Sequence, residues 1–203
     1  MIYPQLVFKC KCGTAQAEIK GKLYAESNCH CHSCVASAKF VESKPNFDGY
    51  SALSNGNGGF AYVLVKGKDI NFTSDIVSEE AHKNIDYVKV GEKGKLARSY
   101  CKRCHTVLGI FEKNFAFLNR NCLFDHGGDP FKPSAPVINI MKKHAFDPDS
   151  VPEPAAATFP FFGALSLMPI MWGFGGKVAP KDSAIYAGKD LSKVEVVPIT
   201  WES

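Results

Sequence analysis

A run of three cysteines within six residues, Cys29 to Cys34, constrains this chain more than any other feature of its sequence. Seven of the eight cysteines fall into three groups with the spacing of metal ligands: Cys10 and Cys12, then Cys29, Cys31 and Cys34, then Cys101 and Cys104. A disulfide between C-x-C neighbours would be strained, whereas both thiolates can point at one ion. We therefore expect the fold to gather these groups around metal.

Ligand counting separates two sites. The first and third groups together supply four thiolates from distant points of the chain, which is the full set of a structural zinc site. The central group supplies only three. Three protein ligands leave a fourth position for water or a substrate thiol, as in catalytic zinc sites. Soft thiolates favour zinc over magnesium or calcium. The sequence therefore predicts two Zn²⁺ ions per chain, one held by four cysteines and one by Cys29, Cys31 and Cys34.

The length of 203 residues predicts one domain, which we assign to residues 5–148, followed by an extension over residues 149–203. The formal net charge of +4 is spread along the chain without a basic stripe, so we do not expect nucleic-acid binding. The first residues show no basic leader followed by a long apolar run. We therefore expect a cytoplasmic protein, in which close cysteine pairs bind metal rather than form disulfides.

Hydrophobic patterning predicts a mainly β fold. Ala15, Ala17 and Ile19 alternate with polar residues, as in a half-buried strand. Further strands are predicted at 60–65, around 70–73, at 87–90, 107–111, 115–118 and 137–140, and as an edge strand within 194–201. A short helix is expected at Val35–Ala38 and a short helix or a loop at 78–84, and residues 43–59 are predicted to be a long loop.

The cysteine pattern resembles the family named for glutathione-dependent formaldehyde-activating enzyme and centromere protein V. The motifs are C-x-C-G at residues 10–13, C-H-C-x2-C at 29–34 and C-x2-C at 101–104. The resemblance runs from about Leu6 to about Ile140. It implies a zinc-binding fold of the β-tent type and the same division of the cysteines into two sites. It also implies a carbon–sulfur lyase that reversibly joins glutathione and formaldehyde to S-hydroxymethylglutathione.

In such an enzyme, Cys31 would belong to the catalytic centre and His30 or His32 would move the proton. Both histidines are also compatible with supporting or surface positions. Arg98 either contacts a substrate carboxylate or is a solvated residue before a turn, and the second is favoured. Cys122 matches no ligand position, so we expect a buried free cysteine. The expected partner is glutathione or the adduct of another small thiol.

The segment Ala155–Gly176 is free of charge and rich in large apolar residues. Its length suits a membrane span, but Pro160, Pro169 and four glycines would break a helix. We therefore expect it to pack on the domain or to join two copies in a homodimer. Such a surface also favours an alternative function, in which the chain is a non-catalytic zinc-binding module for a protein partner. Of the two hypotheses, the open three-thiol site favours the enzyme.

Overall fold

The computed structural model of the protein describes residues 3–55, 58–73, 83–133, 136–158, 191–192 and 194–198. These residues form a mainly β fold with twelve strands and one α-helix, α1 (His32–Glu42), which confirms the predicted fold class. The strands are β1 (Tyr3–Lys9), β2 (Gln16–Gly21), β3 (Ala25–Cys29), β4 (Phe60–Lys66), β5 (Ile70–Phe72), β6 (Ile85–Val90), β7 (Arg98–Cys101), β8 (Val107–Phe111), β9 (Phe115–Asn119), β10 (Leu123–Phe124), β11 (Ile138–Ile140) and β12 (Glu195–Val197). The β-tent assignment stays a prediction.

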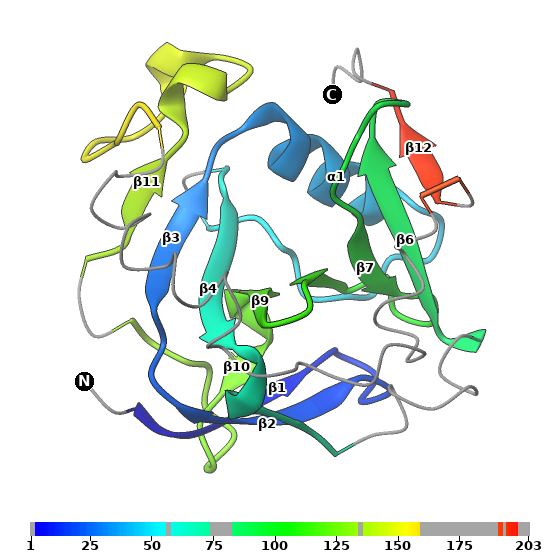
Figure 1. Ribbon diagram of the computed structural model, residues 1–203, viewed down its shortest axis with the longest axis vertical. Coiled ribbons are helices and arrows are strands. Elements are labelled where there is room, and N and C mark those ends of the chain that lie inside the picture. Colours follow the sequence, from blue (N-terminus) through cyan, green and yellow to red (C-terminus); the bar gives the residue numbers. More distant parts are fainter. Residues whose placement is uncertain are drawn as a thin grey trace.

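The strands form two sheets. The larger has the order β11-β3-β4-β9-β8-β7-β6-β12, and the smaller has the order β10-β1-β2-β5 (Figure 1). Neighbouring strands are antiparallel except at the two edges of the larger sheet, where β11 runs parallel to β3 and β12 runs parallel to β6. Parallel pairs need long connections. Both edge strands come from the last third of the chain and flank strands from its first half.

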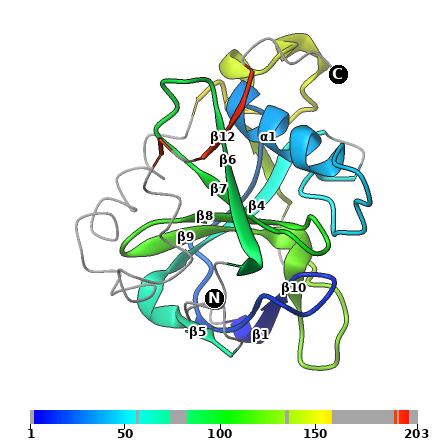
Figure 2. The ribbon, with the colours of Figure 1, turned by 90° about the vertical axis from the view of Figure 1, so that its right-hand side faces the viewer.

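The larger sheet is covered on both faces, and Figure 2 shows α1 and the smaller sheet on opposite sides of it. Strand β4 demonstrates this, since all its residues except the last are buried. Val63 and Val65 pack into the core shared with the smaller sheet, while Phe60 and Tyr62 pack into the core under α1. A strand buried on both faces has a continuous apolar sequence, as Phe60–Val65 does.

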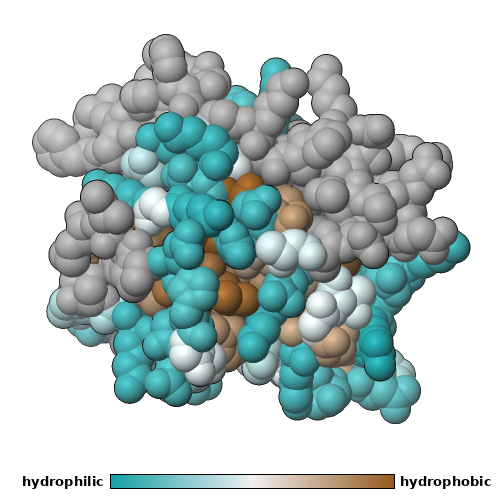
Figure 3. Space-filling model, turned by 90° about the horizontal axis from the view of Figure 1, so that it is seen from below, coloured by the Kyte–Doolittle hydropathy of each residue, from teal (hydrophilic) through white to brown (hydrophobic). Residues whose placement is uncertain are grey.

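The smaller sheet has one face toward the core and one toward solvent. In β2 the predicted alternation is observed: Ala17 and Ile19 are buried, whereas Glu18 is partly exposed and Lys20 is exposed. Figure 3 looks at the molecule from below, and the described surface is mainly hydrophilic, with a narrow apolar area between polar side chains. One-sided burial is the usual arrangement for an antiparallel sheet.

Most of the predicted strands are confirmed, and the helix is longer than expected. Strands β2, β4, β5, β6, β8, β9 and β11 overlap the predicted ranges, and β12 is the expected edge strand. Residues 43–55, 58 and 59 contain no helix or regular strand, as predicted for a loop. However, α1 begins at His32, inside the central cysteine group, rather than after it. Strands β3, β7 and β10 were not predicted.

The described residues of the C-terminal extension lie against the first 148 residues. Val151 is buried, Ala155 bridges to Asn139 beside β11, and β12 pairs with β6. The division between residues 148 and 149 stays a prediction. Residues 159–190, which include most of the apolar segment, lie outside the described residues, and so does the predicted contact between two copies.

Candidate metal centres

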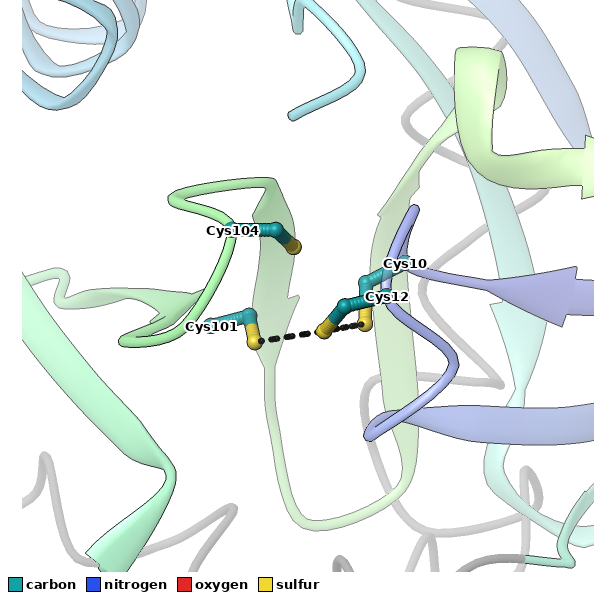
Figure 4. A group of neighbouring side chains, drawn as sticks. All are labelled: Cys10, Cys12, Cys101 and Cys104. Atoms are coloured by element: carbon teal, nitrogen blue, oxygen red, sulfur yellow. Dashed lines mark hydrogen bonds between the residues drawn. The ribbon is translucent and has the colours of Figure 1, made fainter. Parts of the chain in front are cut away.

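The first cysteine cluster joins the two sheets. Cys10 and Cys12 lie in the turn between β1 and β2, and Cys101 and Cys104 lie at the turn between β7 and β8. All four Sγ atoms are within 4.8 Å of one another. Cys12 Sγ is 3.5 Å from both Cys10 Sγ and Cys101 Sγ. Figure 4 shows the four side chains pointing toward a common centre from the two turns. This group could hold a metal ion.

Both turns are shaped by local hydrogen bonds. Gly13 has a φ of +77° and donates its N–H to Cys10 O, which closes the turn after β1. The Ala15 N–H donates to Cys10 Sγ over 3.3 Å. In the other turn, His105 adopts a left-handed φ of 57° and donates its N–H to Cys101 O. These bonds aim the sulfur atoms of each pair in one direction.

Thr106 connects the first cluster to the long loop. Its Oγ1 is 3.1 Å from Cys104 Sγ and accepts the N–H of Tyr50 over 3.1 Å. Gly49 packs directly on the same turn: a Cβ there would lie 2.7 Å from Cys104 O and from the Thr106 nitrogen. Only glycine permits such a close approach of two backbones. The loop therefore supports the cluster from outside.

The thiols of the first cluster differ in pKa. Hydrogen bonds from Cys10 and Cys101 lower the pKa of Cys104, whereas hydrogen bonds with Cys10 and Cys104, together with burial, raise the pKa of Cys101. One thiolate is thus stabilised by its protonated neighbours. A cation is needed for all four to be deprotonated together, because like charges this close repel each other strongly.

The second cluster lies on the opposite face of the larger sheet, in the core under α1. Cys29 ends β3, Cys31 is the residue that precedes α1, and Cys34 lies in its first turn. The three Sγ atoms are within 4.8 Å of one another, and Cys29 Sγ is 3.4 Å from Cys31 Sγ. In the part of the chain that the structure describes, no fourth cysteine, histidine or carboxylate joins this group.

The three thiols of the second cluster differ in pKa. Hydrogen bonds from Cys29 and Cys34 lower the pKa of Cys31, whereas hydrogen bonds with Cys31 and Cys34, together with burial, raise the pKa of Cys29. Cys31 is also the cysteine at the helix N-terminus, where unpaired N–H groups favour negative charge. Cys31 is therefore the member of the cluster that ionises first.

Arg98 places a positively charged side chain next to the second cluster, and its predicted exposure to solvent is wrong. The side chain is only 2% exposed. Its guanidinium donates to Ser33 Oγ over 3.0 Å, to Cys34 Sγ over 3.5 Å and to Leu96 O over 3.2 Å. Its buried Nε has no hydrogen-bond partner among the described residues. A buried guanidinium beside thiols offsets the negative charge that they carry when ionised.

A cavity of about 360 Å³ opens beside the second cluster. It is lined by all three cysteines, by Ser33 and Arg98, and by the apolar or aromatic residues Phe60, Tyr62, Leu96, Ile110, Phe117, Ile140 and Met141. This volume is at the lower end of the range for small-molecule sites. The three-thiol group is thus adjacent to a space where a small ligand can reach its sulfur atoms.

His30 does not line this cavity. It is buried, and its Nε2 donates to Asn139 Oδ1 over 3.0 Å. Asn139 Oδ1 also accepts from Asn28, and Asn139 Nδ2 donates to Pro152 O. The ring packs on Gly59, where a Cβ would lie 2.6 Å from Nε2. These contacts fix the backbone next to Cys29 and Cys31. The catalytic role of His30 stays a prediction.

The remaining candidates have simpler surroundings. The ring of His32 contacts Phe146, with centroids 3.8 Å apart. Cys122 is a fully buried free cysteine, as predicted, and burial raises the pKa of its thiol.

Sequence reasoning missed Ser33, Thr106 and Asn139. Ser33 and Thr106 lie two residues from a motif cysteine and could have been suspected, whereas the bonds of Asn139 to Asn28 and His30 join segments 111 and 109 positions apart.

No protein-family model and no curated protein matches this chain. No helix among the described residues has the length and apolar character needed to cross a membrane. Fold and site together define a mainly β protein with two cysteine clusters that could bind metal ions.

Proposed function

We propose that this chain binds two zinc ions and acts as a carbon–sulfur lyase on thiol–aldehyde adducts. The observation that carries the proposal is the cavity beside a three-thiol cluster that lacks a fourth protein ligand among the described residues. The motif resemblance to the formaldehyde-activating family supports the same reaction and suggests glutathione as the thiol.

The sulfur geometry fits zinc. A Zn–S distance of about 2.3 Å in a tetrahedron requires sulfur atoms about 3.8 Å apart. The Sγ–Sγ distances of 3.4 and 3.5 Å, within groups no wider than 4.8 Å, are close to that value. Thiolate donors also select zinc over hard cations. Cys10, Cys12, Cys101 and Cys104 would hold a structural ion, and Cys29, Cys31 and Cys34 the catalytic one.

Zinc bound by the second cluster would lower the pKa of a substrate thiol in its fourth position, so that the nucleophilic thiolate is present at neutral pH. In the reaction, the thiol sulfur forms a bond to the aldehyde carbon, the C=O π bond breaks, and its electron pair moves to oxygen. The thiol's proton ends on that oxygen. The reverse reaction releases the aldehyde, so no oxidant or reductant is involved.

Arg98 is suited to stabilise the oxygen as it gains charge. Its guanidinium is held beside Cys34 by hydrogen bonds to Ser33 Oγ and Leu96 O, and the second N–H of Nη1 is left to donate. A fixed donor of this kind contributes most where water is excluded. Because the guanidinium lines the cavity and is almost completely buried, it meets that condition.

The test compares Cys31→Ser with Cys122→Ala in the full chain loaded with zinc. Native mass spectrometry counts the metal ions, and NMR with ¹³C-formaldehyde and either glutathione or an apolar thiol follows the hydroxymethyl adduct. For the wild type and Cys122→Ala we expect two zinc ions and accelerated adduct formation with at least one of the thiols, and for Cys31→Ser one zinc ion and no acceleration. Two zinc ions without acceleration for any thiol in the wild type would refute the enzyme and favour the protein-binding module. One zinc ion in the wild type would refute the open site itself.

A further inference from the structure

The cavity beside the second cluster is built mainly of apolar side chains. Phe60 comes from β4, Ile110 from β8, Phe117 from β9 and Ile140 from β11, so four strands contribute to one apolar wall. Apart from the cysteines, the polar side chains that line it are those of Ser33, Tyr62 and Arg98, and no carboxylate among the described residues lines it. A group attached to a sulfur atom at this cluster can enter that space or a shallower hollow beside Cys31 that His32 and His144 also line. Of the two, the cavity that all three cysteines line has the apolar wall, and that wall favours an apolar group on the sulfur.

Charged groups fit this lining poorly. Glutathione at neutral pH carries two carboxylates and an ammonium group. Transfer of an ionised group from water into such a space without a partner is strongly unfavourable, unless the pKa of the group shifts so that it becomes neutral. The guanidinium of Arg98 already donates to Leu96 O, Ser33 Oγ and Cys34 Sγ, which leaves the second N–H of Nη1 as a donor beside the cavity. The cavity therefore offers few polar partners, and its described lining holds no carboxylate to pair with the ammonium group of glutathione.

The volume of the cavity also favours an apolar group on the sulfur. Formaldehyde has only two non-hydrogen atoms and would leave a cavity of about 360 Å³ mostly empty of ligand. Apolar surface removed from water stabilises a complex by roughly 25 cal/mol per Å². A compact ring or branched alkyl group attached to the sulfur would cover the four-strand wall. Leu96, which is 46% exposed and also lines the cavity, lies where such a group would pass from solvent.

We propose that the thiol substrate of this site is a compact apolar thiol, with an aryl or branched alkyl group, rather than glutathione. Its sulfur takes the open position beside Cys29, Cys31 and Cys34, its apolar group covers Phe60, Ile110 and Phe117, and the adduct's oxygen accepts from Arg98. This inference rests on the proposed thiol–aldehyde function, and it narrows the class of thiol that the function uses.

The experiment measures thiol binding without turnover. The full chain is loaded with cobalt(II), whose absorption gains a sulfur-to-metal band when a further thiolate binds. Phenylmethanethiol and glutathione are titrated separately, and phenylmethanol serves as the control that lacks sulfur. We expect phenylmethanethiol to bind at least about tenfold more tightly than glutathione, a ratio that the buried area of one ring can supply. Equal affinities, or tighter binding of glutathione, would overturn the inference.

A pair of variants tests the location. Ile110→Asn puts an amide into the apolar wall, and Ile138→Asn puts the same group on an exposed position that does not line the cavity. We expect the affinity for phenylmethanethiol to fall about tenfold in Ile110→Asn only. Unchanged affinity in that variant contradicts the assignment. Should Ile110→Asn fail to fold by circular dichroism, the wild-type comparison of the two thiols still decides.

The outcomes separate this inference from the function on which it rests. A wild-type chain that takes up two cobalt ions and binds glutathione as well as the apolar thiol keeps the proposed function and loses the inference. A chain that takes up only one cobalt ion, or shows no new band with either thiol, refutes the proposed function and the inference with it.

Discussion

Loss of the metal from the first cluster should destabilise the protein more than loss of the metal from the second. Cys12 and Cys101 are 89 positions apart and belong to turns of different sheets. The second cluster spans only a few residues, from Cys29 to Cys34. A cross-link restricts the unfolded chain more when it closes a longer loop. An ion held by the first cluster therefore acts as a long-range cross-link, and one held by the second does not.

The chain-entropy relation gives the magnitude. Closing a loop of about 90 residues stabilises the folded state by about 4.6 kcal/mol, and closing one of about 6 residues by about 2 kcal/mol. Each substitution removes one cysteine ligand, so the direct loss of a metal–sulfur bond is similar in the two variants. The difference in stability between them therefore comes mainly from the loop-closure free energies. Cys101→Ser should thus lose about 2–3 kcal/mol more unfolding free energy than Cys31→Ser. With a urea m value of about 2 kcal/mol/M, their midpoints should differ by about 1 M.

The assay is urea unfolding followed by far-ultraviolet circular dichroism, with metal content measured beforehand to show that each variant has lost one ion. Chelator-treated wild type supplies the reference in which both ions are absent, and all three samples must reach the same unfolded signal. Equal midpoints for Cys101→Ser and Cys31→Ser, or a lower midpoint for Cys31→Ser, would refute the cross-link reasoning.

Four further outcomes are expected. Gly109→Ala should lower the free energy of unfolding by more than about 3 kcal/mol in thermal denaturation, because φ of Gly109 is +140° and a Cβ there would lie 2.1 Å from Phe117 O. The control Gly127→Ala, at a position without such a φ, should change it little. Similar shifts in the two variants would contradict the argument. Asn139→Ala should lower the free energy of unfolding by about 2–4 kcal/mol in a urea titration, since Asn28 and His30 lose their acceptor. The control Asn71→Ala, at an exposed position, should lower it by less than about 1 kcal/mol. Arg98→Met should keep two metal ions and lower adduct formation about 10²-fold by NMR; full activity would remove Arg98 from the mechanism. Burial raises the pKa of Cys122, so iodoacetamide at pH 8 should leave this cysteine unmodified in the folded chain and label it once urea unfolds the chain, as followed by mass spectrometry. Labelling of Cys122 in the folded chain would argue against its burial.

Much of the fold could be read from local pattern. Phe60–Lys66 is a strand because its residues are apolar and suited to a sheet buried on both faces. Strand β3, with the sequence Ala-Glu-Ser-Asn-Cys, has no such pattern and was missed. It forms because β4 and β11 pair with it on either side. The helix was predicted too short, since its buried face includes Ser37 and several small residues that give little periodic signal.

The sequence by itself determined the three local cysteine groups, because ligands two to five residues apart can meet through local turns. The pairing of strands across the fold then brings Cys12 within reach of Cys101, 89 positions away. It also determined the mainly β class, through residue alternation and strand-forming runs. Only the tertiary structure decided what surrounds each cluster. The burial of Arg98, the bond of His30 to Asn139 and the apolar wall from four strands depend on contacts between distant segments. Those contacts follow from strand order and register, which long-range pairing and core packing fix together and no short stretch of sequence encodes.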